Sequence, residues 1–151
     1  MSGQPEPLTE NTVVRVWDIE TGKVLFKQWQ APRVTHSIAI SPDGKLVAAG
    51  DEGEPATIKI WDIAPGRILH SFVADRSLTY CLDFHPQGRT LASCGNDSNI
   101  KLWDVKTGKR MEELEGHAKG PVAGLAISQD GRFMVSVGFD KQVLTWETQR
   151  K

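Results

Sequence analysis

The 151-residue chain carries 18 lysine and arginine residues against 19 aspartate and glutamate residues, which gives a formal net charge of −1. This balance lacks the basic excess of nucleic-acid-binding proteins, and no apolar run reaches the roughly 18 residues that a membrane span needs. The N-terminal sequence MSGQPEPLTE has neither the basic nor the apolar region of a signal peptide, so we expect a cytoplasmic or otherwise intracellular protein without nucleic-acid or membrane partners.

Thirteen β-strands are expected, because short runs rich in Val, Ile, Leu and Ala alternate with turn sequences. One kind of turn reads SPDGK, HPQGR or SQDGR, and a second kind reads ETGK, APGR or KTGK. Asp-Gly and Gln-Gly tolerate the dihedral angles that such turns need, and the stretches between turns are too short for an amphipathic helix. The expected strands, in chain order, are 13–17, 23–29, 35–40, 46–50, 57–61, 67–73, 78–84, 90–94, 99–103, 109–114, 121–127, 133–137 and 142–146.

A repeat of 42 to 44 residues runs through these strands. Trp-Asp pairs begin at Trp17, Trp61 and Trp103, and a related Trp-Glu pair begins at Trp146. Each tryptophan closes a similar apolar run (VVRVW, TIKIW, NIKLW and QVLTW), and the SPDGK-type turns recur in phase with it. Self-similarity at this period is typical of proteins built from stacked supersecondary units.

On these motifs the chain resembles the WD-repeat (WD40) β-propeller family over residues 12–147. The resemblance implies an all-β fold in which each blade has four antiparallel strands, labelled a to d from the axis outward. By this pattern residues 13–29 supply strands c and d of a first, partial blade. The second blade (35–73) and the third (78–114) are full, and the last (121–146) lacks strand d. The expected fold is therefore an incomplete propeller with two full and two partial blades. An unrelated all-β sandwich is the alternative.

The flanking segments are expected to lie outside the repeats. Residues 1–11 are predicted to form a flexible N-terminal segment, and residues 148–151 a flexible tail. Cys81 and Cys94 lie on neighbouring expected strands, roughly opposite each other. A cross-strand disulfide is conceivable, but buried free thiols are favoured because free cysteine behaves as a small hydrophobe.

The resemblance also implies a hydrogen-bonded tetrad inside some blades. It joins a His before strand a, a Ser or Thr in strand b, an Asp in the b–c turn and the Trp of strand c. The last blade supplies all four, and the third blade has Ala74 at the His position. The second blade keeps only its tryptophan, with Gln30 and Ala49 at the His and Ser positions. The tetrad residues expected are His117, Ser136, Asp140 and Trp146 in the last blade, and Ser93, Asp97 and Trp103 in the third.

The residues His117, Ser136 and Asp140 could also be read as a catalytic triad. The structural interpretation is favoured, because Ser136 is expected to be buried and a nucleophile must be reachable. The four histidines show no metal-ligand spacing, and the two TGK sequences lack the upstream glycine of a phosphate loop. The acidic stretch 51–54 is read as a solvated loop in preference to a cation site. We therefore expect no catalytic residue, no metal and no cofactor.

Many members of this family bind partners on the top face, around the central channel. The contributing positions lie near the start of strand a and just before the Asp of the b–c turn. Aromatic and arginine side chains at such positions suit an interface, because they dominate binding hot spots. Loop residues without a partner are the alternative. The candidate partner-binding residues are Arg33, Val34, His36, Arg76, Leu78, Tyr80, Asn96 and Phe139, with Pro121 and Ala123 at matching positions of the last blade.

The expected function is a non-enzymatic scaffold or adaptor that binds other proteins or peptides. Closed propellers have about 4 to 8 blades, so the chain is expected to be the C-terminal part of a larger propeller. One alternative is a half-propeller that closes by homo-oligomerisation or with a second propeller half. Others are a regulatory domain cut from a multidomain protein, and a hydrolase built on a propeller frame.

Overall fold

The computed structural model describes residues 13–29 and 33–148, and the described residues form thirteen strands and no helix. The predicted segment 1–11, most of the predicted tail and Gln30 lie outside this description. Within it, no helix could span a membrane. The strands are β1 (Val13–Trp17), β2 (Val24–Trp29), β3 (Thr35–Ile40), β4 (Leu46–Asp51), β5 (Ala56–Asp62), β6 (Arg67–Asp75), β7 (Thr79–Phe84), β8 (Thr90–Gly95), β9 (Asn99–Asp104), β10 (Arg110–Glu115), β11 (Val122–Ile127), β12 (Phe133–Gly138) and β13 (Val143–Glu147).

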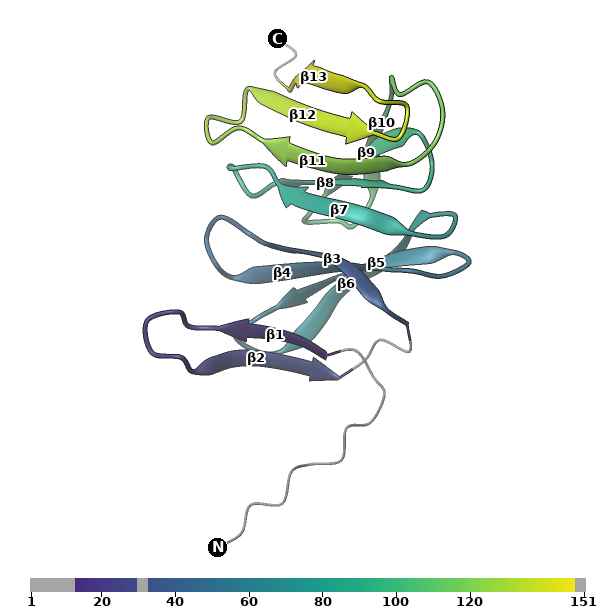
Figure 1. Ribbon diagram of the computed structural model, residues 1–151. Helices are drawn as coiled ribbons and strands as arrows, with labels where there is room; N and C mark the ends of the chain where they lie inside the picture. The colour runs from purple at the N-terminus through teal and green to yellow at the C-terminus, as the bar shows by residue number, and fades with distance from the viewer. Residues whose placement is uncertain (1–12, 30–32, 149–151) are drawn as a thin grey trace, which may run out of the picture.

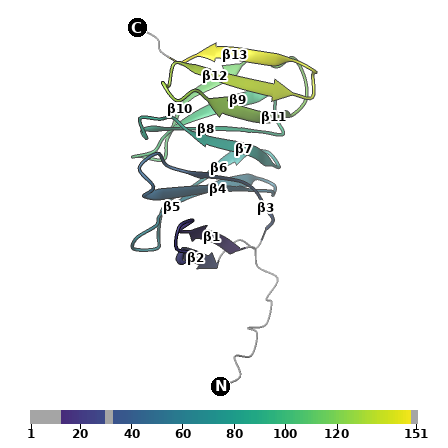
Figure 2. The ribbon, with the colours of Figure 1, turned by 60° about the vertical axis from the view of Figure 1, so that its left-hand side comes forward.

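The strands form four antiparallel sheets, each made of consecutive strands. They are β1–β2, β3–β6, β7–β10 and β11–β13, and they correspond to the first, second, third and last blades. The sheets stack in chain order, so the first blade and the last lie at opposite ends of the stack in both views (Figures 1 and 2). The prediction of two full and two partial all-β blades is confirmed.

The strand bounds agree with the expected ranges to within two residues. The largest difference is at β6, which continues to Asp75 because Ala56 pairs with Asp75 across the β5–β6 ladder. The turns between strands a and b form as their sequences predict. At Ser41 the hydroxyl accepts the Leu46 N–H at 2.9 Å, and Gly44 adopts a φ of +70°, which residues with a side chain rarely take.

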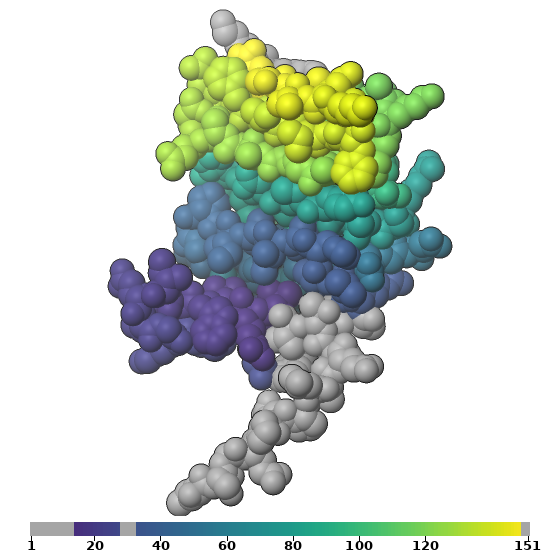
Figure 3. Space-filling model, in the orientation of Figure 1, coloured from purple at the N-terminus to yellow at the C-terminus, as the bar shows by residue number. Residues whose placement is uncertain are grey.

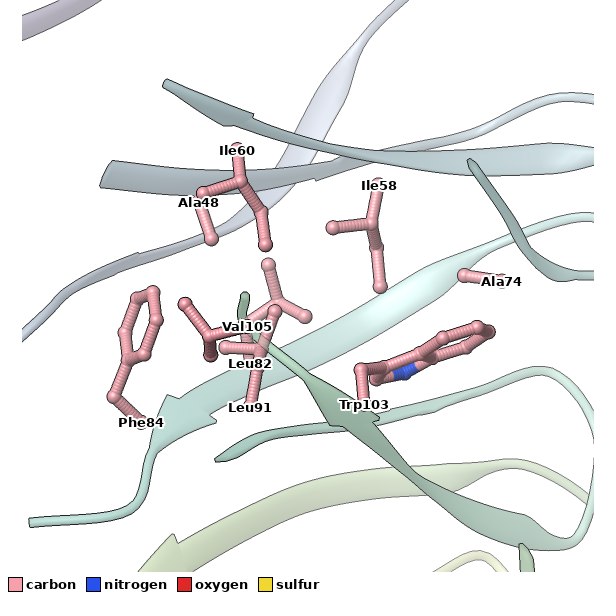
Figure 4. Packing of buried hydrophobic residues seen from close by; sticks show 9 residues of the cluster. All are labelled: Ala48, Ile58, Ile60, Ala74, Leu82, Phe84, Leu91, Trp103 and Val105. Atoms are coloured by element: carbon pink, nitrogen blue, oxygen red, sulfur yellow. The ribbon is translucent and has the colours of Figure 1, made fainter. Parts of the chain in front are cut away.

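Apolar packing between successive sheets forms the core. The largest cluster lies between the second and third blades, where Ile58 and Ile60 face Trp103 and Leu91 (Figure 4). The tryptophan of strand c packs against strand d of the preceding blade. Phe72 stacks on Trp103 with ring centroids 4.4 Å apart, and Phe26 lies 6.2 Å from Trp61. Each blade thus covers its predecessor, and the blades form successive bands in Figure 3.

The two ends of the stack lack this cover. In the last blade Val135 is 39% exposed and Val137 is 42% exposed, whereas Ala92, at the position in β8 that matches Val135, is fully buried. At the other end Ile38 is 52% exposed, whereas the matching Leu82 of the third blade is 6% exposed. The described residues therefore form an open arc with an apolar face at each end.

Candidate functional site

The last blade joins its four tetrad side chains in one hydrogen-bonded group. Nδ1 of His117 lies 3.0 Å from both carboxylate oxygens of Asp140, and Nε2 of His117 lies 2.8 Å from Oγ of Ser136. The indole N–H of Trp146 donates to the same oxygen at 2.9 Å. Ser136 is only 1% exposed, so the group pairs buried polar atoms across β12, β13 and the loop before β11.

Burial and hydrogen bonding act in opposite directions on Asp140. Burial raises the pKa of this carboxyl. Hydrogen bonds from His117 and from the backbone N–H groups of Gln142 and Ala118 lower the pKa, and together they outweigh the effect of burial. The net effect holds the pKa of Asp140 below its usual value, so the residue is a carboxylate at neutral pH. A charged Asp140 anchors the imidazole of His117 and the start of strand c together.

The third blade keeps the tryptophan bond, since the indole N–H of Trp103 donates to Oγ of Ser93 at 2.8 Å. Its histidine position holds Ala74, which packs in the core. The neighbouring Asp75 is buried, and one of its carboxylate oxygens lies 3.9 Å from Nζ of the buried Lys101.

Lys101 also forms an ion pair with Asp97. An ion cluster of the buried Asp75 and Lys101 with the half-buried Asp97 therefore occupies the region that His117 and Asp140 fill in the last blade. Sequence reasoning missed Asp75 and Lys101. The available signals were a lysine in the middle of the apolar run NIKLW and an aspartate beside the histidine position.

The second blade has the sparsest network. With Ala49 at the serine position, the buried Nε1 of Trp61 has no hydrogen-bond partner among the described residues. Asp51 nevertheless accepts hydrogen bonds from the backbone N–H and the hydroxyl of Thr57, at 2.5 and 2.7 Å. It thus binds the first N–H of the c-strand run, as Asp97 and Asp140 do in their blades. Sequence reasoning missed this role because the longer turn separates the two residues by six positions.

The predicted top-face residues lie at one end of the blades, with His36, Tyr80 and Ala123 near the starts of β3, β7 and β11 and the others in the adjoining loops. Equivalent backbone bonds hold these loops together in three blades: the N–H groups of Glu52, Asn96 and Phe139 donate to the carbonyls of Val34, Leu78 and Pro121 at 2.9 to 3.0 Å. The loop that follows strand b is therefore tied to the segment that precedes strand a. This repeated bond gives the top face a defined backbone frame.

The side chains of these top-face residues differ in whether they form hydrogen bonds or ring contacts with other residues of the chain. The guanidinium of Arg33 donates to the Pro55 carbonyl at 2.7 Å, and Nε2 of His36 lies 2.9 Å from the Glu52 carboxylate. In the third and last blades, Tyr80 and Phe139 bring their rings to a centroid distance of 6.3 Å.

Phe139 is 64% exposed, whereas Tyr80 is half-buried. Arg76 and Asn96 are exposed, Val34 is exposed in the second blade, and Leu78 is half-buried beneath the Asn96 loop. The structure thus brings Tyr80 and Phe139 together as an aromatic pair. Arg33 and His36 are engaged within the second blade.

Cys81 and Cys94 are register partners in the β7–β8 ladder, and both are free thiols. The favoured prediction of free thiols is confirmed. A hydrogen bond to Cys81 and burial raise the pKa of Cys94. In the part of the chain that the structure describes, no three His, Cys, Asp or Glu side chains gather as metal ligands would.

Comparison with known proteins points to one repeat family. The family model described as "WD domain, G-beta repeat" matches residues 25–62, 66–104 and 108–147. Each match runs from a strand d or the turn before it to the end of the next strand c, and the three matches together cover most of the chain.

Two of three similar proteins carry the WD repeat in their names. The chain is 26% identical over 141 residues to "WD repeat and SOCS box-containing protein 1" of Homo sapiens, covering 93% of the chain and 23% of the relative. It is 28% identical over 136 residues to "WD repeat-containing protein SL1-17" of Schistosoma mansoni, covering 90% of the chain and 44% of the relative. It is 38% identical over 63 residues to "DDB1- and CUL4-associated factor 10" of Danio rerio, covering 41% of the chain and 12% of the relative. The chain spans less than half the length of each of these relatives.

Proposed function

The chain belongs to the WD40 family of WD-domain, G-beta repeats, and from that premise we propose that it is a non-enzymatic scaffold or adaptor that binds other proteins inside the cell. The observation that carries the proposal is the aromatic pair of Tyr80 and Phe139 on the top face. The pair spans two blades, and its loops are held by backbone hydrogen bonds. A rigid, partly exposed aromatic pair binds a partner at low entropic cost.

The exposed cations around the pair extend the same surface. Arg76 lies in the segment before β7, and Lys119 lies in the loop before β11, where a β-carbon added to Gly120 would lie 3.7 Å from the β-carbon of Phe139. Arginine and aromatic side chains are enriched in the centres of protein interfaces. A partner segment with an apolar anchor and an acidic flank fits this combination.

The names of two relatives support a role in protein assemblies. One is called an associated factor of DDB1 and CUL4, and another carries a SOCS box beside its WD repeats. Both statements belong to those proteins. For the present chain they support the choice of a protein partner over a small-molecule substrate.

The absence of catalysis is part of the proposal and rests on the burial of Ser136. Its hydroxyl oxygen already receives the Trp146 N–H and faces the His117 imidazole, so a substrate carbonyl has no path to it. A catalytic serine must be reachable and must lie beside an oxyanion site. The Ser–His–Asp arrangement is instead proposed to fasten the blade.

The test of the top face is the double variant Arg76→Ala with Tyr80→Ala. The expected result is loss of the partners that the wild-type chain retains in affinity isolation, with an unchanged circular dichroism spectrum. The matched control changes Arg67→Ala and Ile68→Ala, which are both exposed at the start of β6, at the opposite end of that strand from Asp75 and Arg76. Retained binding by the top-face variant, or equal loss in the control, refutes the site.

A second function is favoured by the two exposed apolar faces. The chain also acts as a structural segment of a propeller that further blades complete, supplied by a second copy, a partner chain or a longer protein. Val143, on strand c of the last blade, is 68% exposed, whereas the matching Ile58 and Ile100 are fully buried. Large apolar faces of this kind mark contact surfaces.

Solution mass tests this second function. Light scattering of the purified chain is expected to show self-association that Val137→Lys with Val143→Lys abolishes. A monomeric wild-type chain rules out closure by a second copy and leaves a partner chain or a longer protein as the source of the missing blades.

A further inference from the structure

A groove lies between the second and third blades at the end opposite the top face. It occupies about 540 Å³ and is lined by the beginnings of β4 and β6 and by the two turns of the third blade at that end. We call it the basic groove. Its apolar floor is made of Leu46, Leu69 and Val105, of which Val105 belongs to the central core cluster in Figure 4.

Two cations border this floor. Arg89 and Lys106 are both exposed, and their side-chain nitrogens form no hydrogen bond or close ion pair within the described residues. The backbone beneath them is fixed, since the Val105 N–H donates to the Arg89 carbonyl at 2.9 Å and His70 Nε2 lies 3.1 Å from the Lys106 carbonyl. The backbone positions of Arg89 and Lys106 are therefore fixed at the edge of the groove, and their exposed side chains remain available to a ligand.

The single carboxylate in the lining is already engaged. Asp104 accepts the Thr107 N–H at 2.7 Å, and hydrogen bonds from the Thr107 side chain and backbone keep its pKa below the usual value. It therefore stabilises the turn that carries Lys106. Asp104 also attracts Lys106 electrostatically and offsets part of its charge, so the groove presents an apolar floor between two exposed cations.

The next inter-blade groove has the opposite chemistry. It lies between the third and last blades, occupies about 570 Å³, and has four glutamates and no cation in its lining. These are Glu112, Glu113, Glu115 and Glu147. We call it the acidic groove. Two inter-blade grooves of similar size in one chain thus carry opposite charge. A cation recurs at the turn position of Arg89, as Lys45 and Arg132, whereas Lys106 has Ala64 as its counterpart in the second blade, so Lys106 is specific to this groove.

We propose that the basic groove binds an extended acidic peptide segment. One leucine-sized side chain of the peptide lies on the floor formed by Leu46, Leu69 and Val105. Carboxylates that flank it pair with Arg89 and Lys106. Charge complementarity selects this occupant, because the apolar floor accepts the leucine and the two cations repel a basic peptide.

The proposal concerns the end of the blades away from the top face, so the two sites succeed or fail separately. The probe is a fluorescein-labelled peptide, Glu-Asp-Leu-Glu-Glu, with two comparison peptides in which Leu becomes Ala or every acidic residue becomes Lys. Binding is followed by fluorescence anisotropy with the full chain. The acidic leucine peptide is expected to bind saturably and more weakly as salt rises. Both comparison peptides are expected to bind at least about 10-fold more weakly.

The variant pair isolates the groove from the net charge of the molecule. Arg89→Glu with Lys106→Glu is expected to lower the affinity on the order of 10-fold or more. The control, Lys23→Glu with Arg132→Glu, makes the same charge change at exposed turn positions outside the groove, and is expected to change the affinity by less than about 2-fold. The double variants keep the fold because all four side chains are exposed, and circular dichroism verifies this.

Three results overturn the proposal. The first is no saturable binding of the acidic leucine peptide up to about 1 mM, the weak end of specific affinity. The second is equal weakening by the groove variant and the control variant, which shows that only net charge acts. The third is equal binding of the leucine and alanine peptides, which removes the floor from the interaction.

Discussion

The second and last blades share strands a to c and their tryptophan position but are stabilised in different ways. The second blade lies between two neighbours, and its Ile58 and Ile60 are fully buried. Its tryptophan, however, leaves a buried indole N–H without a partner among the described residues. The last blade is covered on one face only, with Val143 largely exposed, but its Trp146 indole is satisfied through Ser136.

We infer from this difference that apolar packing between blades and hydrogen-bonded side chains within a blade can each stabilise a repeat. Each repeat buries its apolar face on a neighbour, and stability in such arrays is close to a sum of repeat and interface contributions. A blade at the end of the arc loses one interface. In the last blade the hydrogen-bonded group around His117 satisfies the tryptophan indole. The second blade instead keeps its interface with the third blade and a partial interface with the two-stranded first blade.

The largest expected difference between the two blades is in the free energy of unfolding after a lysine substitution at one matched position. Ile58→Lys places a charge in a fully buried site and is expected to cost more than about 4 kcal/mol, enough to unfold the chain. Val143→Lys changes the matching residue of the last blade at an exposed site and is expected to stay within about 0.5 kcal/mol. Urea denaturation followed by tryptophan fluorescence measures both. A large loss at Val143 contradicts an open outer face.

A smaller loss of stability is expected when the hydrogen-bonded group of the last blade is broken at Ser136. Ser136→Ala leaves His117 Nε2 and the Trp146 N–H unsatisfied, so we expect a loss of about 2–4 kcal/mol in the free energy of unfolding. Ser93→Ala in the third blade removes only the Trp103 bond and is expected to cost about 1–2 kcal/mol. Equal losses at the two serines refute the extra role of His117.

A substitution in the second blade can supply the hydrogen-bond partner that its tryptophan lacks. Ala49→Ser places a hydroxyl where Ser93 and Ser136 meet their tryptophans, and the Trp61 indole gains a partner. We expect a gain of about 1 kcal/mol. Ala48→Ser is the matched control, because this residue faces the opposite side of β4 in the central cluster. That control is expected to lose stability, and a gain in both variants shows that the indole bond is not the cause.

The smallest expected effect is on the pH dependence of stability. Because the folded pKa of Asp140 lies below its unfolded value of about 4, this carboxylate stabilises the fold above that value. The contribution is lost as the pH falls through the folded pKa. Melting curves between pH 7 and pH 3 are expected to fall less steeply at the acid end for Asp140→Asn than for wild type. Glu20→Gln, at an exposed turn position, is the comparison variant.

The strands and blades could be predicted because their causes are local. Turn sequences of the SPDGK type, glycines such as Gly44 with a positive φ, and the recurring tryptophan fix where each strand ends. The pairing of Cys81 with Cys94 followed from the hairpin that joins their strands. Local sequence contains this information, so the thirteen strands agree closely with expectation.

The side-chain groups were harder to predict because their partners are brought together only by folding. Asp75 and Lys101 meet across two strands, and Asp51 reaches Thr57 across an extended turn. The two inter-blade grooves depend on how neighbouring sheets pack. Arg89 and Lys106 belong to the HPQGR and KTGK turns, but only folding brings these two turns to one groove. The engagement of Arg33 and His36 within the second blade likewise becomes visible only in three dimensions.

We propose that the chain recognises other proteins and that its buried Ser–His–Asp group fastens a blade without catalysing a reaction. A fluorophosphonate probe, which labels activated serines, tests this directly when the folded chain is treated with it and any adduct is located by peptide mass spectrometry. We expect no adduct at Ser136, because its hydroxyl is buried and hydrogen-bonded to Trp146. An adduct at Ser136 that His117→Ala abolishes would contradict it.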